Sequence, residues 1–318
     1  MPIIENDPWR EQYFEHVACP ASVVIPTDDG DAYNLFPKQR WVYNKLLIAE
    51  SQNIRCAPHG LNPPEFPVFS KPIYNMRGMG TGSCVIATLE EWHRAQAPGH
   101  MWMELLTGAH VSTDVAVIAG KPQWWRHATG KPLKGGTFDY WTVHANAKHG
   151  LEAYCGEWLG RNLSDYTGMV NFETIGGRII ECHLRFTDQW PDLYGAGWID
   201  AVVALYEKGI WSYKDEDRRI GYSVVLFGEH GIKYTIDRSR VHELLKEYPE
   251  VASIQITFRD DKPLEAHAMP PGGFRLAIVN CWDLDAGLDL RDRLALRFWT
   301  AGHTRLPRGR RSKRAAAQ

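Results

Sequence analysis

Hydrophobic and polar side chains alternate between residues 170 and 185, on both sides of the glycine pair Gly176-Gly177. Side chains of a β-strand point alternately to its two faces, and a glycine pair between alternating runs favours a tight turn. The segment is therefore predicted to be a β-hairpin. One face of its second arm carries Glu181, His183 and Arg185, and the other face carries Ile180, Cys182 and Leu184.

Similar patterns predict six more elements before residue 210. Apolar residues three and four positions apart indicate helices, and short apolar runs bounded by glycine or proline indicate strands. The predicted helices span residues 38–56, 89–97, 147–163 and 199–208, and the predicted strands span residues 66–71 and 112–118.

The pattern changes to short strands after residue 220. Strands are predicted at 222–227 and 252–258, with a helix at 241–248 between them. The run Pro270-Pro-Gly-Gly predicts a turn that leads into a buried strand, and a closing helix is predicted over residues 290–299.

Composition narrows the class of protein. A chain of 318 residues with 44% hydrophobic content can bury a sizeable core in one to three domains. Its net charge of −2 gives no general attraction to nucleic acid or membranes. The basic stretch that opens residues 305–318 is predicted to be a solvated, disordered tail; contact with RNA, anionic lipid or an acidic partner is the alternative.

The expected location is the cytoplasm. No apolar run approaches the ~20 residues that a transmembrane helix needs, and the first residues lack the pattern of a secretory signal. The six cysteines are scattered without a Cys-x-x-Cys pair, which fits reduced thiols. We therefore expect a soluble protein without a membrane partner.

The predicted hairpin brings two carboxylates and a cation together. Glu173 on the first arm and Glu181 on the second suit Mg²⁺, which proteins usually hold by one or two carboxylates together with nucleotide phosphates. The planar donor fork of Arg185 suits a phosphoryl group. This combination indicates ATP chemistry, and an ordinary hairpin with a solvated polar face is the alternative.

A lysine followed by a glycine-rich loop adds to this interpretation. Lys71 ends the strand predicted at 66–71, and the run Gly78-Met-Gly80-Thr-Gly82-Ser83 follows it. Such a loop exposes backbone N–H groups that can cover phosphates, and the lysine adds a point charge. The lysine precedes the glycines, so this is not a Walker A loop.

A third polar cluster joins tryptophans to cations between residues 124 and 134. Arg126, Lys131 and Lys134 could face a triphosphate or a substrate carboxylate, or they could stack on Trp124 and Trp125. The pattern favours neither interpretation.

These motifs, in this order, resemble the ATP-grasp superfamily over roughly residues 20–300. Asn44-Lys45 resembles the start of the family's helix with its first ATP lysine, and Phe69-Ser-Lys71 the strand with its second. The stretch Met101-Trp-Met-Glu104 is similar to the family's hinge. Glu173 and Glu181 fall on its paired Mg²⁺ carboxylates, and Arg185 falls on its phosphate-facing arginine.

The resemblance implies a set of site residues. It assigns the ATP-binding role to Lys45, Lys71, Gly78, Gly80, Gly82, Ser83, Glu104, Leu105, Leu106, His110 and Asp114. It assigns the metal to Glu173, Glu181 and His183, and it makes Lys71 and Arg185 the catalytic residues. The implied cofactors are ATP and Mg²⁺.

The chain departs from the family pattern in three places. His183 stands where the family often has Asn, and imidazole favours softer ions than Mg²⁺. His110 stands where Glu is usual. Only 44 residues precede Lys45, whereas the family generally has a domain-sized region there. This shortened end leaves the substrate site partly open and favours a homodimer or a partner protein that completes it.

The resemblance also implies the architecture. The expected class is α+β, an ATP-grasp fold in which two α+β subdomains grip the nucleotide, with a small α/β domain at the carboxyl end. The expected units are a truncated segment at 1–37, a small subdomain at 38–118, a large subdomain at 119–198, a carboxy-terminal domain at 199–304 and the basic tail at 305–318.

The implied activity is that of an ATP-dependent carboxylate-amine ligase. In this mechanism a small-molecule or peptide carboxylate becomes an acyl phosphate, and an amine displaces the phosphate. The sequence names neither substrate, and nothing in it points to nucleic acid. Three alternatives stay open: an ATP-binding regulatory module with little turnover, a carboxylase and an acyl-phosphate kinase.

Overall fold

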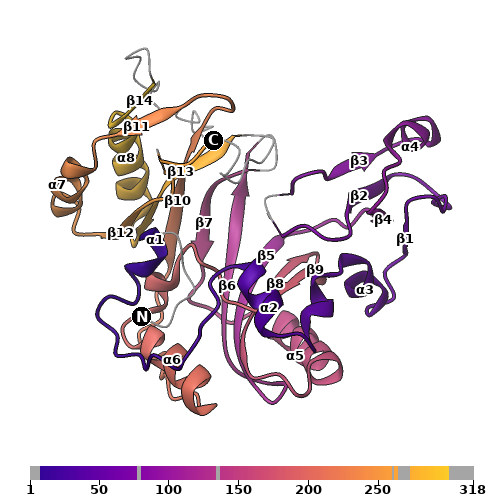
Figure 1. Cartoon of the computed structure of the whole chain (residues 1–318), viewed down its shortest axis with the longest axis horizontal. Coiled ribbons are helices and arrows are strands. Elements are labelled where there is room, and N and C mark those ends of the chain that lie inside the picture. Colours follow the sequence, from indigo (N-terminus) through magenta and orange to yellow (C-terminus); the bar gives the residue numbers. More distant parts are fainter. Residues whose placement is uncertain (1–7, 77–79, 134–136, 260, 264–272, 301–318) are drawn as a thin grey trace, which may run out of the picture.

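A small lobe projects from a larger body (Figure 1). The computed structural model describes residues 8–76, 80–133, 137–259, 261–263 and 273–300. Helices and strands are mixed throughout, which confirms the predicted α+β class. No helix in these ranges is long and apolar enough to cross a membrane.

The small lobe is built on an antiparallel sheet in the order β1-β4-β2-β3. Its elements are β1 (Cys56–Pro58), β2 (Val68–Pro72), β3 (Cys84–Ile86), β4 (His100–Glu104) and helix α4 (Leu89–Ala95). Met101 and Met103 on β4 pack near Ile54, whereas Trp102 packs with Trp92 of α4. The two-residue alternation of β4 thus buries both faces of this sheet.

The body is built on one antiparallel sheet of eight strands, in the order β12-β13-β10-β7-β6-β5-β8-β9. The strands are β5 (His110–Ile118), β6 (Lys121–Pro132), β7 (Phe138–Val143), β8 (Gly168–Ile175), β9 (Arg178–His183), β10 (Gly221–Gly228), β12 (Val251–Ile256) and β13 (Phe274–Cys281). The small and large subdomains were expected to meet at residue 118, which is the end of β5. The chain passes from the small-lobe sheet to the eight-stranded sheet earlier, between β4 and β5.

Two helices cover opposite faces of this sheet. Val115 and Val117 on β5 pack with Trp158 of α5 (His149–Asn162), whereas Ala116 packs in the cluster of Trp198 on α6 (Trp198–Lys208). Alternate residues of one strand therefore belong to two cores. The strand is buried from Val111 to Val117, which accounts for its apolar second half and also places Ser112, Thr113 and Asp114 in the interior.

The carboxy-terminal part continues the same sheet through β10, β13 and β12. Its helices α7 (Val241–Lys246) and α8 (Leu284–Ala295) pack on these strands in a shared apolar core. A two-stranded sheet joins β11 (Tyr234–Ile236) to β14 (Phe298–Thr300), and a 3-10 turn, η3 (Arg238–Arg240), precedes α7.

The amino-terminal segment runs across the body. It extends from α1 (Pro8–Glu11), against β12, to α2 (Asp29–Leu35), near β9 (Figure 1). The short helices η1 (Arg40–Tyr43) and α3 (Lys45–Glu50) then lead into the small lobe, and η2 (Pro191–Tyr194) follows the hairpin.

Two predicted helices are wrong in extent. The helix expected at 38–56 is divided at Asn44, which has an extended backbone and whose side-chain Oδ1 caps α3 by accepting from the N–H groups of Leu46 and Leu47. The closing helix expected at 290–299 begins earlier, at Leu284 after its N-cap Asp283, and ends at Ala295. Residues 298–300 form β14 instead.

The remaining predicted elements are present with small changes at their ends. The hairpin at 170–185, the strand with Lys71, the helices near 89–97, 147–163, 199–208 and 241–248, and the strands near 112–118, 222–227, 252–258 and 274–280 all appear. The basic tail at 305–318 lies outside the described residues.

Candidate active site

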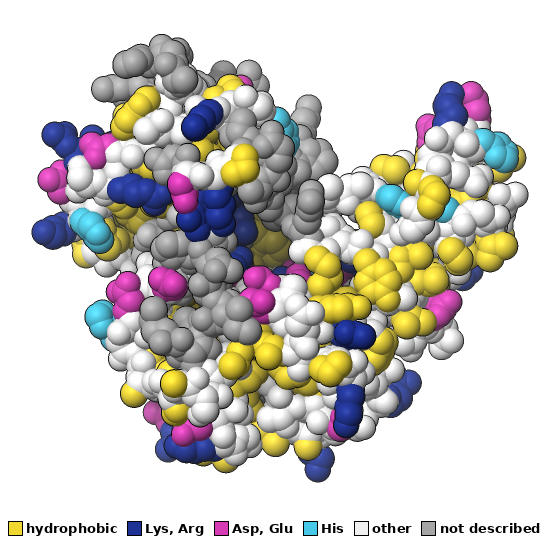
Figure 2. Space-filling model, in the orientation of Figure 1, with side chains coloured by type: hydrophobic (Ala, Val, Ile, Leu, Met, Phe, Trp, Pro, Cys, Tyr) yellow, Lys and Arg dark blue, Asp and Glu magenta, His cyan; other side chains and the backbone are white. Residues whose placement is uncertain are grey.

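One cavity of about 550 Å³ lies where the small lobe meets the body. Figure 2 shows this hollow, with hydrophobic side chains gathered on the part of the small lobe beside it. Eleven of the residues predicted from the sequence line it: Lys71, Gly80, Ser83, Glu104, Leu105, Leu106, His110, Glu173, Glu181, His183 and Arg185. Residues that are more than a hundred positions apart in the sequence therefore meet in one place.

The hairpin sets the spacing of the two predicted metal carboxylates. Glu173 on β8 lies directly opposite Glu181 on β9, and the register shifts immediately after this pair, where Thr174 faces Ile179. Ile180 is thus the extra residue of a β-bulge. The bulge breaks the predicted alternation: Ile179 joins Cys182 and Leu184 in the α5 core, whereas Ile180 lines the cavity.

The bulge also gives Lys71 its partner. Lys71 Nζ donates to the carbonyl oxygen of Ile180 at 2.9 Å. Burial lowers the pKa of Lys71 to about 8, although the nearby carboxylate of Glu181 acts in the opposite direction. A lysine from the small lobe is therefore held against the strand that carries one of the acids.

Lys45 does not line the cavity itself, but it reaches the same acid. Its Nζ lies 2.6 Å from Glu181 Oε1. Burial disfavours a charged carboxylate, yet the positive charge of Lys45, followed by those of His183 and Lys71, outweighs burial and lowers the pKa of Glu181 to about 2. Glu181 is therefore ionised at neutral pH.

His110 pairs with the other acid. Its Nε2 is hydrogen-bonded to Glu173 Oε2. Burial alone would lower the pKa of His110, but the charge of Glu173 and this hydrogen bond outweigh burial and raise it. His110 also touches the rings of Phe138 and Trp141, with centroids 5.4 and 5.7 Å away. It thus connects the acid pair to an aromatic wall of the cavity.

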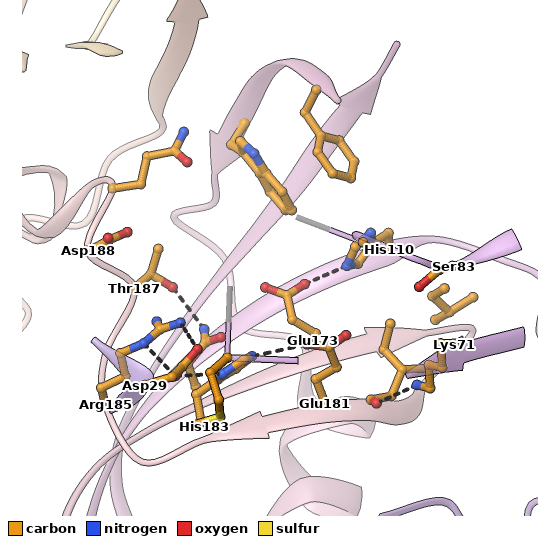
Figure 3. A pocket seen from close by; sticks show the side chains of 18 of the residues that line it. Asp29, Lys71, Ser83, His110, Glu173, Glu181, His183, Arg185, Thr187 and Asp188 are labelled. Carbon is orange, nitrogen blue, oxygen red and sulfur yellow. Dashed lines mark hydrogen bonds and ion pairs between the residues drawn. The ribbon is translucent and has the colours of Figure 1, made fainter. Parts of the chain in front are cut away.

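Asp29 organises the residues at the end of the hairpin, and the sequence had not marked it as a site residue. Arg185 donates from Nε to Asp29 Oδ1 at 2.8 Å and from Nη2 to Oδ2 at 3.1 Å. His183 Nδ1 lies 3.0 Å from Asp29 Oδ1 (Figure 3). Burial opposes charge on Asp29, but Arg185 and then His183 outweigh it and hold its pKa far below the usual range.

The three-residue metal set predicted from the sequence is not gathered around one point. Among the described residues, no group of three or more His, Cys, Asp or Glu side chains could hold a metal ion. His183 instead lies between two carboxylates, with Nε2 at 3.6 Å from Glu181 Oε2. The facing pair Glu173 and Glu181 still fits Mg²⁺, which takes oxygen ligands and needs few of them from the protein.

Asp114 lies in the protein interior and does not line the cavity. It accepts from Asn171 Nδ2 at 2.8 Å, from Thr187 N at 3.0 Å and from the Tyr194 hydroxyl at 2.7 Å. Asn171 and Thr187 both line the cavity. Asp114 therefore lies behind the cavity wall, where it accepts hydrogen bonds from two residues that line the cavity.

The remaining predicted residues fall at the edge of the site or outside it. Gly82 packs near Pro72 and does not line the cavity, and Gly78 lies outside the described residues. The Glu104 carboxylate accepts from Arg55 Nε at 3.0 Å. Arg126 is buried and donates to Asp215 at 3.3 Å, away from the cavity, so neither interpretation of the tryptophan-rich cluster describes it.

The end of the cavity away from Lys71 contains charges that sequence reasoning missed. Figure 3 shows Glu173 and Glu181 between Lys71 on one side and Asp188 on the other. Arg10, Gln189 and Arg275 also line this end. They come from the first described helix, from the segment after the hairpin and from β13. No local motif relates them, so only the fold reveals the group.

No protein-family profile and no curated protein matches the chain. Solved structures do match. An L-amino acid ligase from Bacillus licheniformis has a TM-score of 0.60 at 13% identity, covering 92% of this chain and 82% of its own. A phosphoribosylamine–glycine ligase from Thermotoga maritima has a TM-score of 0.61 at 14% identity, covering 93% and 87%.

A third similar structure is a carboxyaminoimidazole ribonucleotide synthase from Aspergillus clavatus complexed with ATP. Its TM-score is 0.55 at 12% identity, with 86% of this chain and 78% of the other covered. At such identities the likeness concerns the fold, and it extends over both lobes and the carboxy-terminal part. The polypeptide described above has the ATP-grasp fold, which confirms the resemblance found in its sequence motifs.

Proposed function

We propose that this protein is an ATP-dependent ligase that joins a carboxylate to an amine. One observation carries the proposal: Lys71, Glu173, Glu181 and Arg185 line a single cavity, and Lys45 is bound to Glu181. Charged side chains held together at the junction of two lobes suit phosphoryl transfer, in which positioning and charge neutralisation account for most of the catalysis.

Each lobe has a role in holding ATP. The apolar side chains at the small-lobe end, Phe69, Met103, Leu105 and Leu106, suit the adenine ring, and Lys71 with the residues around Ser83 suits the phosphates. Glu173 and Glu181 would hold Mg²⁺. When bound there, the ion would neutralise phosphate charge.

The proposed reaction has two steps. A carboxylate oxygen of the acid attacks the γ-phosphorus of ATP, the bond to the bridging oxygen breaks, and ADP leaves. The amine nitrogen then attacks the acyl carbon, the C–N bond forms, and phosphate departs. Lys45 and Lys71 neutralise the triphosphate in this scheme. Arg185 has three of its donor groups engaged, two of them by Asp29, so it supplies a fixed positive charge beside the acid.

The test is ADP release with pooled acids and amines, together with hydroxamate formation when hydroxylamine replaces the amine. Glu181→Gln should reduce both by roughly 100-fold or more, because a loss of about 3 kcal/mol in charge stabilisation corresponds to that factor. Glu90→Gln is the matched control, since Glu90 is 80% exposed on α4, where its carboxylate pairs with Arg94. ADP release without hydroxamate would contradict the acyl phosphate.

A second candidate, an ATP-binding regulatory module, has one observation in its favour. Asp29 already neutralises Arg185, and Lys45 already neutralises Glu181. Such pairing is compatible with a site that binds a nucleotide without turning it over. ATP binding that Glu181→Gln abolishes, with no acid or amine pool ever raising ADP release by the unaltered protein, would favour the module.

A further inference from the structure

Arg275 lines the cavity at the end away from Lys71. Arg275 donates from Nη1 to Gln189 Oε1 at 3.3 Å, and its guanidinium lies 5.8 Å from the ring of Trp9. Within the described part of the chain, no carboxylate lies at salt-bridge distance from it. Arg10 and Arg185, in contrast, are paired with Asp188 and Asp29. Arg275 therefore keeps donors available to a bound anion.

Asp188 offers the complementary group beside it. Arg10 donates to the Oδ2 atom of Asp188, from Nε at 2.9 Å and from Nη2 at 2.6 Å. Oδ1 accepts no hydrogen bond from the described residues. Asp188 also lines the cavity, and it is the carboxylate whose charge acts most strongly on Arg275. An acceptor for a cation thus lies near a donor for an anion.

The fold explains why Arg275 faces the cavity. Phe274 and Leu276 on either side of it are fully buried in the core of the carboxy-terminal part. Arg275 pairs with Phe227 of β10 where the register shifts, and both residues line the cavity. The alternation of β13 therefore directs an arginine out of an apolar strand and into the site.

An aromatic wall stands next to these charges. Phe138 and Trp141 have ring centroids 4.4 Å apart, and Trp141 and Trp190 have centroids 5.2 Å apart. All three line the cavity, although Trp141 is only 8% and Trp190 only 2% exposed. Val225 lies on the same cavity wall as Phe227. An apolar group of a ligand would be buried here.

We propose that this end of the cavity binds a zwitterionic α-amino acid with an apolar side chain, and that this amino acid is the amine substrate of the ligase. Its carboxylate pairs with Arg275, its ammonium group with Asp188 Oδ1, and its side chain lies against the aromatic wall. A carboxylate held by Arg275 is not available for phosphorylation, so the reacting group is the nitrogen. This inference rests on the function proposed above.

The amino acid reacts in the second step of the ligase reaction. The ammonium group loses a proton to water, and the neutral nitrogen attacks the acyl carbon of the acyl phosphate. The C–N bond forms, the bond between the acyl carbon and the oxygen bridging to phosphorus breaks, and phosphate leaves with that oxygen and the second nitrogen proton. The products are an amide that keeps the free carboxylate of the amino acid, and inorganic phosphate.

The experiment measures binding to the full chain by calorimetry, with L-phenylalanine, L-phenylalaninamide, 3-phenylpropionate and benzylsuccinate as probes. We expect L-phenylalanine to bind at least about tenfold more tightly than the amide or the phenylpropionate, since each lacks one charged partner. Arg275→Met should weaken L-phenylalanine binding by roughly 10- to 100-fold and leave binding of the amide unchanged. Asp188→Asn should weaken L-phenylalanine and leave 3-phenylpropionate unchanged.

The controls separate this inference from the proposed function. Arg293→Met changes a half-exposed arginine of α8 that contacts Glu247, and it should bind every probe normally. Binding of Mg-AMPPNP by Arg275→Met shows that the variant is folded, and Arg275→Lys should recover part of the affinity. If the nucleotide does not bind the parent protein, the proposed function fails.

Three results would overturn the inference while the nucleotide still binds. The first is no L-phenylalanine binding at about 10 mM, a concentration that detects Kd values in the millimolar range. The second is L-phenylalanine binding that Arg275→Met leaves unchanged. The third is benzylsuccinate binding more tightly than L-phenylalanine and depending on Arg275, because the site would then receive a dicarboxylic acid and no amine.

Discussion

Replacing Lys71 with methionine is expected to stabilise the fold while it removes nucleotide binding. Lys71 is 3% exposed, and burial lowers its pKa from 10.5 to about 8. Holding the charge in the folded protein at pH 7 therefore costs about 3 kcal/mol, at 1.36 kcal/mol per pKa unit. Loss of the hydrogen bond to the Ile180 carbonyl costs about 1 kcal/mol. Methionine has a similar length, so the expected net gain is about 2 kcal/mol.

The pH dependence has a defined sign. The folded-state pKa of Lys71 is lower than its unfolded value, so the unfolded chain binds more protons between pH 8 and pH 10.5. The free energy of unfolding of the parent protein should therefore rise over this range relative to Lys71→Met. The unfavourable contribution is complete below pH 8 and absent above pH 10.5, where only the lost hydrogen bond distinguishes the two proteins.

Urea unfolding followed by tryptophan fluorescence at pH 7, 8, 9 and 10 measures the difference. Lys208→Met is the control, because Lys208 is exposed on α6 and its substitution should leave the unfolding free energy within about 0.5 kcal/mol at every pH. A Lys71→Met protein that is no more stable than its parent at pH 7, with a difference that does not change with pH, would refute the argument. Mg-AMPPNP titration then checks the loss of binding.

Three further substitutions probe other contacts. Asp29→Asn leaves the buried charge of Arg185 without its carboxylate and should destabilise the fold by about 3–5 kcal/mol, measured as a urea midpoint. Burial raises the pKa of Asp192 from 3.8 to about 6, so between these pH values the folded state binds more protons than the unfolded chain, and the free energy of unfolding falls as pH rises. Asp192→Asn should remove about 3 kcal/mol of this fall. Parallel plots of unfolding free energy against pH for the two proteins would contradict the argument. Gly120→Ala places a Cβ 2.5 Å from Ser164 Cα at a φ of +72°, and should cost about 1–3 kcal/mol in thermal unfolding with unchanged nucleotide binding.

Local sequence signals were sufficient for the hairpin that carries the two acids of the site. The glycine turn and the two-residue alternation predict the hairpin and place one acid on each arm, but an unbroken register would pair Glu173 with Ile180, and only the bulge at Ile180 brings Glu181 opposite Glu173. Lys71 was found for a similar reason, because it ends an apolar strand and precedes a glycine-rich loop. The hairpin and the strand of Lys71 are each encoded within a short segment, and both were predictable.

Contacts between distant segments were not predictable. Asp29 and Arg185 are 156 positions apart, and no periodicity relates the start of α2 to the end of the hairpin. The bulge at Ile180 was missed as well, because an extra residue in a strand has no composition signal of its own here. Arg275 was visible only as one residue in a buried strand. The extent of the closing helix was wrong because the N-cap at Asp283 was overlooked.

The continuity of the eight-stranded sheet has a consequence for substrate length. Arg275 on β13 and Glu173 on β8 belong to one sheet, in which β10 and β7 join the two halves through four residue pairs. The separation between these two side chains cannot widen unless backbone hydrogen bonds break. In the proposed ligase the sheet would hold the amino-acid site and the acid pair at a fixed distance, so adjustment to a nucleotide would fall to the small lobe, and an amino acid of the wrong length would not reach the acyl phosphate.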